Sequence, residues 1–300
     1  LGIEAATPGL FFFALNKVGM SIVNAAQRMR AFALYTSLRY SMMVAGLLIA
    51  MATDMPTDRF AMLFSIAEGV LFVPLAFEVA RQMRGPASAA WRAWSWEHLR
   101  YGAKSVLSGM LLELNSKVDV LMIGAFMDDG AVGIYSVAAL IAEGLFQLLV
   151  VLQNNYNPAL AVHIADGKLR ELEGIVAKGR KLTYMLFGGV AVLALAAFPL
   201  YLALVGKAEF HGAWAPLALL IAGMFAASGY MPFAQTLLMA NRPGWHTGMM
   251  ASCVLCNAGL CLLLVPMWGL AGAATATALS LVWAAFALKF MVRRHVGLQI

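Results

Sequence analysis

Long apolar runs alternate with short polar segments along the whole chain. Each run has about 20 residues or more, the length a helix needs to cross a hydrocarbon core of about 30 Å at about 1.5 Å per residue. We therefore expect an all-α polytopic membrane protein. Its nine expected transmembrane helices lie at about 8–27, 31–53, 60–81, 104–126, 131–160, 182–205, 213–239, 246–266 and 270–292.

The segments between the runs predict where the chain turns. Residues 128–130 and 267–269 are long enough only to link the two helices of a hairpin. Inside the seventh run, Gly229 and Pro232 interrupt the helical pattern, because proline lacks an amide hydrogen and its ring clashes with the preceding turn. We expect a kink there, with neighbouring groups satisfying the freed backbone carbonyl.

Composition narrows the class of protein. The 300 residues are 62% hydrophobic and only 12% charged, with a mean hydropathy of +0.79, whereas soluble domains are about 45–50% apolar and about 25% charged. Too little polar surface is left to face water, which excludes a soluble enzyme. With three cysteines in 300 residues, a disulfide scaffold is excluded as well.

Basic residues predict the orientation, because Lys and Arg are retained on the cytoplasmic side. One set of alternate loops holds sixteen of the 21 Lys and Arg residues, and the other set holds only Arg59 and Lys207. We therefore expect a cytoplasmic C-terminus. The same asymmetry accounts for the net charge of +6, so no nucleic-acid partner is expected.

Two longer segments are expected on the cytoplasmic side. Residues 82–103 combine tryptophans with arginines, a composition typical of an interfacial helix or anchor. Residues 163–181 place apolar side chains at helical spacing among charges, which predicts a short amphipathic helix on the membrane surface. Neither segment is long enough for a folded catalytic domain.

Several polar residues fall at membrane depth. An ionised side chain there costs about 2.5–3.5 kcal/mol on insertion scales, so such residues usually line a cavity or a packed interface. Arg39 lies near a helix end, where we expect it to extend toward the headgroups. The other candidates are Asn16, Lys17, Glu68, Glu113, Lys117, Asp119, Glu143, Gln147 and Asn154.

Spacing relates some of these residues to one another. Glu113 and Lys117 are four positions apart, so we expect them to pair on one helix face. Ser136, Glu143, Gln147 and Asn154 fall within about 40° of one another on a helix, which predicts a polar stripe. The pair could instead be a buried ion pair without a transport role, and the stripe could be hydrogen-bonding contact between helices. Both alternatives stay open at this point.

The first three and last three runs share a layout. In each triplet the first run is interrupted by polar residues and is followed by a basic turn, at 27–30 or at 241–244. A link that contains a proline joins the second run to the third. Both triplets start on the same side, which predicts a parallel repeat about an axis along the membrane normal. Since the chain begins with Leu1 in an apolar run, we expect a piece of a longer protein, with three helices before residue 1.

Two segments resemble a known family, the polysaccharide flippase branch (O-antigen, capsule and exopolysaccharide) of the multidrug/oligosaccharidyl-lipid/polysaccharide exporter, or MATE-like, superfamily. The first segment comprises Lys117 to Gly124 followed by residues 132–138. The second comprises Asn257 followed by residues 265–277. The resemblance implies helices 4–12 of a twelve-helix, two-lobe transporter. Residues 1–97 would be the second half of the N-terminal lobe, with an interfacial linker at about 82–103, and residues 98–300 the six-helix C-terminal lobe.

The resemblance also implies a function. Such a flippase moves undecaprenyl-pyrophosphate-linked oligosaccharide across the bacterial inner membrane by ion-coupled alternating access. It would contact membrane lipids and other polysaccharide-assembly proteins, and it would use no cofactor beyond a coupling ion, H⁺ or Na⁺. Asn16, Lys17, Lys117 and Asn154 would face the substrate, and the candidates for ion coupling or gating would be Glu68, Glu113, Asp119, Glu143 and Gln147.

Two other functions are compatible with the residues. A cation-coupled multidrug exporter of the same superfamily would favour acidic cavity residues, whereas a pyrophosphate lipid favours Lys and Arg. The chain has both kinds. A membrane-embedded polysaccharide polymerase or sugar transferase is less favoured, because the expected external loops are short and hold only scattered acids.

Overall fold

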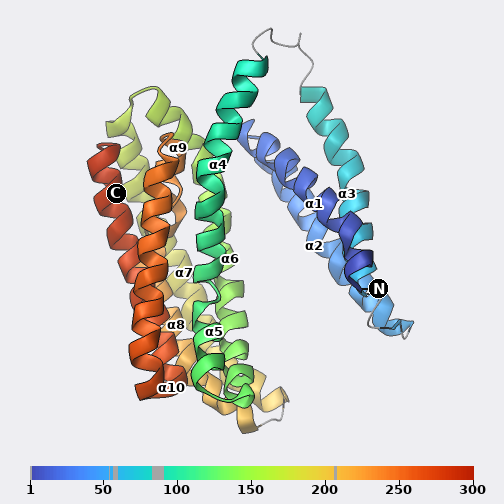
Figure 1. The fold of residues 1–300 in the computed structure, drawn as a ribbon, viewed down its shortest axis with the longest axis vertical. Coiled ribbons are helices and arrows are strands. Elements are labelled where there is room, and N and C mark those ends of the chain that lie inside the picture. Colours follow the sequence, from blue (N-terminus) through green and yellow to red (C-terminus); the bar gives the residue numbers. More distant parts are fainter. Residues whose placement is uncertain (1, 54, 57–59, 83–90, 206–207) are drawn as a thin grey trace. The chain divides into compact units, whose positions relative to one another are not determined.

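A computed structural model describes residues 2–53, 55–56, 60–82, 91–205 and 208–300. Within these ranges the secondary structure is helical throughout, without strands (Figure 1). The chain divides into two compact units, Leu1–Trp91 and Arg92–Ile300. The boundary that the sequence suggests, after residue 97, falls a few residues further along.

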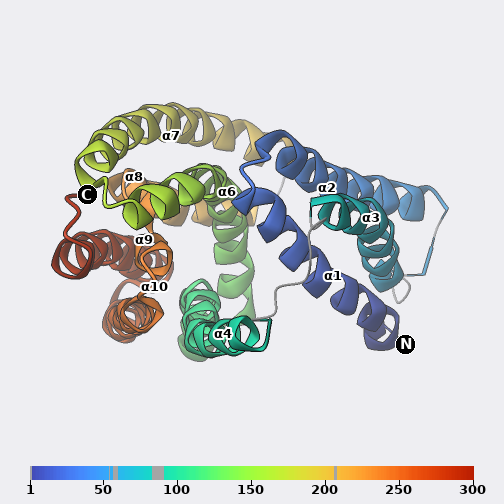
Figure 2. The ribbon, with the colours of Figure 1, turned by 90° about the horizontal axis from the view of Figure 1, so that it is seen from above.

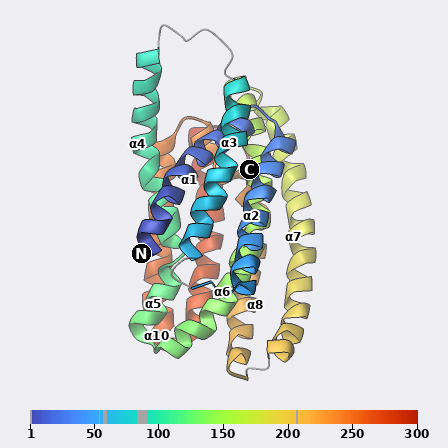
Figure 3. The ribbon, with the colours of Figure 1, turned by 90° about the vertical axis from the view of Figure 1, so that its right-hand side faces the viewer.

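Three helices form the first unit: α1 (Gly2–Ala25), α2 (Met29–Ala52) and α3 (Phe60–Gln82). They lie side by side in Figures 1 and 3. Helix α1 approaches α3 closely at Gly9, where the backbone N–H of Gly9 donates to the Ser65 hydroxyl at 3.0 Å. Met20, Val23 and Leu75 form a small buried apolar cluster between the same two helices.

The second unit is built from the remaining elements. These are α4 (Trp91–Asn115), α5 (Val118–Phe126), α6 (Asp129–Ala165), α7 (Leu169–Val205), η2 (Ala208–Ala213), α8 (Trp214–Ser228), η3 (Met231–Phe233), α9 (Thr236–Met239) and α10 (Pro243–His295). Helix α8 packs against α6, α7 and α10, which places it centrally in this unit.

The helices account for the predicted spans. Among the described residues, seven helices are long and apolar enough to cross a membrane. Helix α10 has 53 residues, enough for two crossings, and its backbone breaks at Gly269 (φ 54°, ψ −130°) where the sequence predicts a hairpin link. The fourth expected span consists of α4 and α5 in succession (Figure 1). The seventh is interrupted after Ser228, which confirms the predicted kink.

One prediction about a surface segment is wrong. No separate amphipathic helix covers 163–181, because α7 runs unbroken from Leu169 to Val205, and Figure 2 shows it as one curved helix. The described part of the tryptophan segment is the start of α4, which begins at Trp91 and continues into the fourth span. Trp94 and Trp96 are exposed on its first turns. Residues 83–90 of the linker, Arg59 and Lys207 lie outside the described residues.

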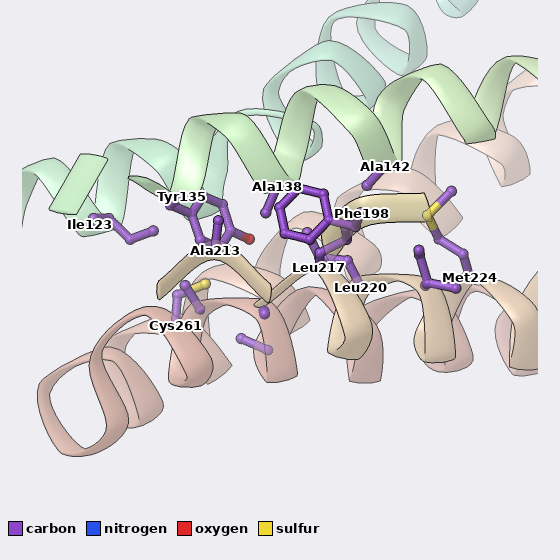
Figure 4. Packing of buried hydrophobic residues seen from close by; sticks show 14 of the residues in the cluster. Ile123, Tyr135, Ala138, Ala142, Phe198, Ala213, Leu217, Leu220, Met224 and Cys261 are labelled. Atoms are coloured by element: carbon purple, nitrogen blue, oxygen red, sulfur yellow. The ribbon is translucent and has the colours of Figure 1, made fainter. Parts of the chain in front are cut away.

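The main apolar core lies in the second unit. Tyr135, Ala138 and Ala142 of α6 point toward side chains from α8 and α10, among them Leu217 and Cys261 (Figure 4). All five are buried. Because these residues fix one face of α6 in the core, the opposite face of the helix is directed away from it.

The two basic turns predicted as related have the same backbone. Gln27 (φ 56°) and Asn241 (φ 55°) both adopt the left-handed conformation that ends a helix. The following N–H donates five residues back in each turn, from Arg28 to the Val23 carbonyl at 3.2 Å and from Arg242 to the Leu237 carbonyl at 2.8 Å. The predicted likeness of 27–30 and 241–244 therefore extends to the hydrogen bonds of the turns.

Close packing of the α10 hairpin supports a stability prediction. A Cβ atom on Gly272 would overlap the backbone carbonyl of Leu264, across the break at Gly269. We expect Gly272→Ala to destabilise the protein by about 1–3 kcal/mol, the usual cost of overpacking, measured by thermal unfolding in detergent. Gly259→Ala is the matched control, because a Cβ there meets no atom within 4 Å. Equal melting temperatures for the two variants would contradict the expectation.

Candidate functional site

A buried carboxylate, Asp119, joins three helices of the second unit. Its Oδ2 accepts hydrogen bonds from the Tyr135 hydroxyl of α6 at 2.6 Å and from the Thr277 hydroxyl of α10 at 3.1 Å. Its Oδ1 accepts the backbone N–H of Val120 at 2.8 Å. Asp119 is 6% exposed. The sequence singled out Asp119 as a site residue, whereas Tyr135 and Thr277 entered the sequence analysis only as members of the segments 132–138 and 265–277.

A neighbouring amide satisfies the backbone where the fourth span breaks. Helix α4 ends at Asn115, and the freed Asn115 carbonyl accepts the Asn257 side-chain amide at 3.2 Å. The Cys261 thiol lies 3.6 Å from the Asn257 Oδ1. Asn257 is fully buried. The break is therefore supported by α10, as non-helical backbone at membrane depth requires.

Lys117 lies in this break, and its partner is not the predicted one. Because Ser116 and Lys117 form a turn between α4 and α5, the one-helix geometry that would pair Lys117 with Glu113 is absent. Lys117 Nζ lies instead 3.5 Å from Glu143 Oε2 of α6. The two side chains are 50% and 57% exposed. Glu113 is exposed and forms no ion pair within the described part of the chain.

The polar stripe of α6 lies on the surface of the second unit. Glu143 and Gln147 are exposed, and Ser136 and Asn154 are partly exposed. The opposite face of α6 is the one buried in the core (Figure 4). Contact between helices within this unit therefore does not explain the stripe. Charged groups at membrane depth that face outward need a water-filled space or a polar partner, since lipid supplies neither.

A second buried carboxylate, Glu68, lies in the first unit. Glu68 is fully buried; Arg39 Nε lies 2.8 Å from its Oε1, and Arg39 Nη2 donates to its Oε2 at 3.0 Å. The Asn16 amide donates to Glu68 Oε2 at 2.8 Å and to the Glu68 carbonyl at 2.9 Å. The expectation that Arg39 extends to the headgroups is wrong, because this ion pair holds its guanidinium inside the unit.

Lys17 lies one residue beyond Asn16 but faces outward. Its side chain is exposed, with Nζ 5.2 Å from the centre of the Phe13 ring, and the Arg39 guanidinium lies at the same distance from that ring. No carboxylate of the described residues lies within ion-pair distance of Lys17. Lys17 and Arg39 therefore differ, since Arg39 is neutralised by Glu68 and Lys17 has no such partner among the described residues.

The interrupted helix between Ser228 and Pro243 is fastened by side chains from its neighbours. The Tyr101 hydroxyl of α4 donates to the Leu238 carbonyl at 3.0 Å, and the Gln153 amide of α6 donates to the Met231 carbonyl at 3.3 Å. Arg180 of α7 donates to the Tyr230 hydroxyl at 2.8 Å. None of these partners could be predicted from the local sequence, because the freed groups and their donors are far apart in the chain.

Comparison with solved structures identifies the known fold that the chain shares. Neither a family model nor a curated protein matches the chain. A crystal structure of a mutant of the Vibrio cholerae MATE transporter VcmN is 14% identical, with a TM-score of 0.80 over 97% of this chain and 69% of that one. VcmN in its bent form, also 14% identical, aligns with a TM-score of 0.71 over 98% and 68%.

The chain has the fold of a MATE transporter. This confirms the prediction of an all-α polytopic membrane protein, and the fold is the one that the resemblance implies. A likeness at 14% identity shows the fold alone. The polysaccharide branch, the substrate and the roles of the site residues stay predictions.

Proposed function

We propose that the protein is a membrane transporter that flips undecaprenyl-pyrophosphate-linked oligosaccharide across the bacterial inner membrane. Alternating access would be coupled to H⁺ or Na⁺. The MATE fold supports the transporter part of the proposal. The observation that carries the choice of substrate is the pair of exposed lysines, Lys17 and Lys117, on segments that the sequence predicts to span the membrane.

Exposed lysines at membrane depth favour an anionic ligand. Lys17 lies beside an aromatic ring without a carboxylate partner among the described residues, and Lys117 has only a loose contact with Glu143. An ammonium in a site of low dielectric binds phosphate oxygens through short, charge-assisted hydrogen bonds. A pyrophosphate joined to a lipid has both the anionic group that a lysine would bind and an apolar chain suited to membrane depth.

Asp119 is our candidate for the coupling group. It is a buried carboxylate held by two hydroxyls from different helices, so gain or loss of a cation would change the contacts of α5, α6 and α10 together. Coupling needs a group whose occupancy biases a two-state element. The basic turns and the C-terminal segment would face the cytoplasm in this scheme, following the distribution of Lys and Arg.

Substitution of Asp119 tests the coupling. We expect Asp119→Asn to reduce gradient-dependent transport by about tenfold or more, because neutral Asn neither binds a proton nor attracts a cation. The measurement is transport with and without an imposed pH or sodium gradient. Asp166→Asn is the control, since Asp166 is half-exposed and pairs with Lys168 at 3.4 Å. Unaltered gradient dependence in Asp119→Asn would exclude Asp119 as the coupling group.

A cation-coupled multidrug exporter is the second candidate. Exposed Glu113 and Glu143 favour it, because acidic side chains attract cationic drugs. Lys117 opposes it, since its ammonium lies 3.5 Å from the Glu143 carboxylate and repels a cation at that site. The ammonium of Lys117 therefore offsets the attraction of Glu143 for a cation, and the choice of the anionic substrate rests on the exposed lysines.

Deletion of the gene in its host distinguishes the two functions. We expect lipid-linked oligosaccharide to accumulate on the cytoplasmic leaflet, with loss of surface polysaccharide. Normal polysaccharide with new drug sensitivity would establish the exporter instead. Loss of the lipid-linked unit itself would indicate a membrane-embedded enzyme, the third function compatible with the sequence.

A further inference from the structure

The break between α4 and α5 decides where the side chain of Lys117 lies. Asn257, a fully buried residue of α10, donates its side-chain amide to the Asn115 carbonyl at 3.2 Å, two residues before Lys117. We propose that Asn257 is a positioning residue for anion binding, which keeps the two helices apart at this point and so leaves the Lys117 ammonium available to a diphosphate. This inference rests on the proposed function, in which Lys117 binds the substrate.

Side chains supply the hydrogen bonds that the break removes. In a continuous α-helix each backbone N–H would donate to the carbonyl four residues before it. Here the Ser116 hydroxyl donates to the Glu113 carbonyl at 2.8 Å, and Asp119 Oδ1 accepts the first free N–H of α5 beyond it at 2.8 Å. Asn257 supplies the third such bond, to the Asn115 carbonyl. Of these three, only the bond from Asn257 comes from another helix.

The local sequence does not forbid a continuous helix. Residues 115–117 include no glycine or proline, and closing the break would exchange hydrogen bonds from side chains for the same number of backbone ones. Because each kind of bond contributes a similar free energy, this exchange is nearly balanced. The broken form is then favoured by the amide of Asn257, since a buried donor left without an acceptor is costly.

The two forms give Lys117 different surroundings. In the broken form its Nζ lies 3.5 Å from Glu143 Oε2 of α6, and Glu113 is not among its partners. A continuous helix would bring Lys117 onto the face of Glu113, one turn away, where glutamate and lysine pair. A bound anion would then have to compete with the Glu113 carboxylate as well. Loss of the broken form therefore weakens anion binding at Lys117.

The test measures the dissociation constant of farnesyl diphosphate, below its micellar concentration, on the purified protein. We expect Asn257→Leu to raise this constant about fivefold, because Leu branches at Cγ as Asn does but donates no hydrogen bond. Ser280→Ala is the matched control. Ser280 is also a buried polar residue of α10, but its hydroxyl donates to the Cys253 carbonyl at 3.3 Å, within α10 itself. Its dissociation constant should equal that of the unsubstituted protein.

Two double variants distinguish positioning from a general loss of structure. Asn257→Leu should have no further effect on a protein that already carries Lys117→Gln, because the ammonium that it positions is absent. Glu113→Gln should leave the unsubstituted protein unchanged but restore binding to Asn257→Leu, since it removes the carboxylate that a continuous helix brings to Lys117. A general loss of structure would add to the effect of Lys117→Gln and would not be relieved by Glu113→Gln.

Ser116→Ala tests the break without altering a buried residue. Ser116 is exposed, and alanine both removes the hydroxyl bond to the Glu113 carbonyl and favours a helix. We expect the dissociation constant of farnesyl diphosphate to rise about threefold. This variant decides the question if Asn257→Leu does not fold.

The outcomes separate the positioning role from the function on which it rests. If Lys117→Gln weakens diphosphate binding while neither Asn257→Leu nor Ser116→Ala does, the positioning role is overturned and the lysine site stands. The role is overturned as well if Asn257→Leu weakens binding equally with and without Lys117. If Lys117→Gln itself leaves binding unchanged, the lysine site of the proposed function fails, and the inference fails with it.

Discussion

Arg39→Met is expected to destabilise the first unit by about 3–5 kcal/mol, the cost of leaving a buried charge without its partner. Glu68 is fully buried, and the side chain of Arg39 is only 11% exposed. Removal of the guanidinium takes away two contacts to the carboxylate at once. The Asn16 amide remains but carries no net charge. The measurement is equilibrium unfolding in mixed detergent micelles.

The double variant Arg39→Met/Glu68→Gln separates loss of the pair from loss of packing. It removes both charges and keeps an acceptor for Asn16, so we expect most of the lost stability to return. Arg30→Met, at an exposed position, is the control and should change stability by no more than about 0.5 kcal/mol. If the double variant were as unstable as Arg39→Met, the charge pair would not be the cause.

Lys117→Gln is expected to lower transport of lipid-linked diphosphate by about 10–100-fold. This range corresponds to the loss of one charge-assisted hydrogen bond, about 1.5–3 kcal/mol. Gln keeps most of the side-chain volume and a hydrogen-bond donor, so the charge is the main change. The measurement is the initial rate of flipping by reconstituted protein present in equal amounts. Lys17→Gln should have an effect in the same direction.

The control for the lysine variants has to be a lysine outside the predicted cavity. Lys181→Gln meets this condition, because Lys181 is exposed on α7, close to where the expected sixth span begins. Arg39 is unsuitable as a control, since its ion pair with Glu68 makes any substitution a test of stability. A rate for Lys117→Gln equal to that of Lys181→Gln would remove Lys117 from the substrate site.

Hydrophobic patterning predicted the helices because a membrane helix depends on a local property, its length of apolar sequence. The hairpin break at Gly269 and the kink after Ser228 were predicted for the same reason, since glycine and proline act on their own turns. The extension of α7 down to Leu169 was missed, because a charged amphipathic stretch has the same pattern whether it lies on a surface or continues a span.

The pairing of the site residues could not be predicted in the same way. The wrong pair, Glu113 with Lys117, followed from assuming an unbroken helix, and the turn at Ser116 has no glycine or proline to reveal it. The contacts of Arg39 with Glu68 and of Asp119 with Thr277 join different helices. Such contacts depend on how helices pack, which spacing within one helix does not specify.

Transport by the reconstituted protein tests the central claim most directly. The protein as its host makes it would be placed in vesicles containing a fluorescent undecaprenyl-pyrophosphate oligosaccharide, and its transfer between leaflets followed as a membrane-impermeant reagent quenches the outer one. We expect transfer that depends on an imposed ion gradient and falls in Lys117→Gln but not in Lys181→Gln. Absence of transfer, in vesicles where the same protein exports a cationic dye, would contradict the lipid flippase and establish a drug exporter.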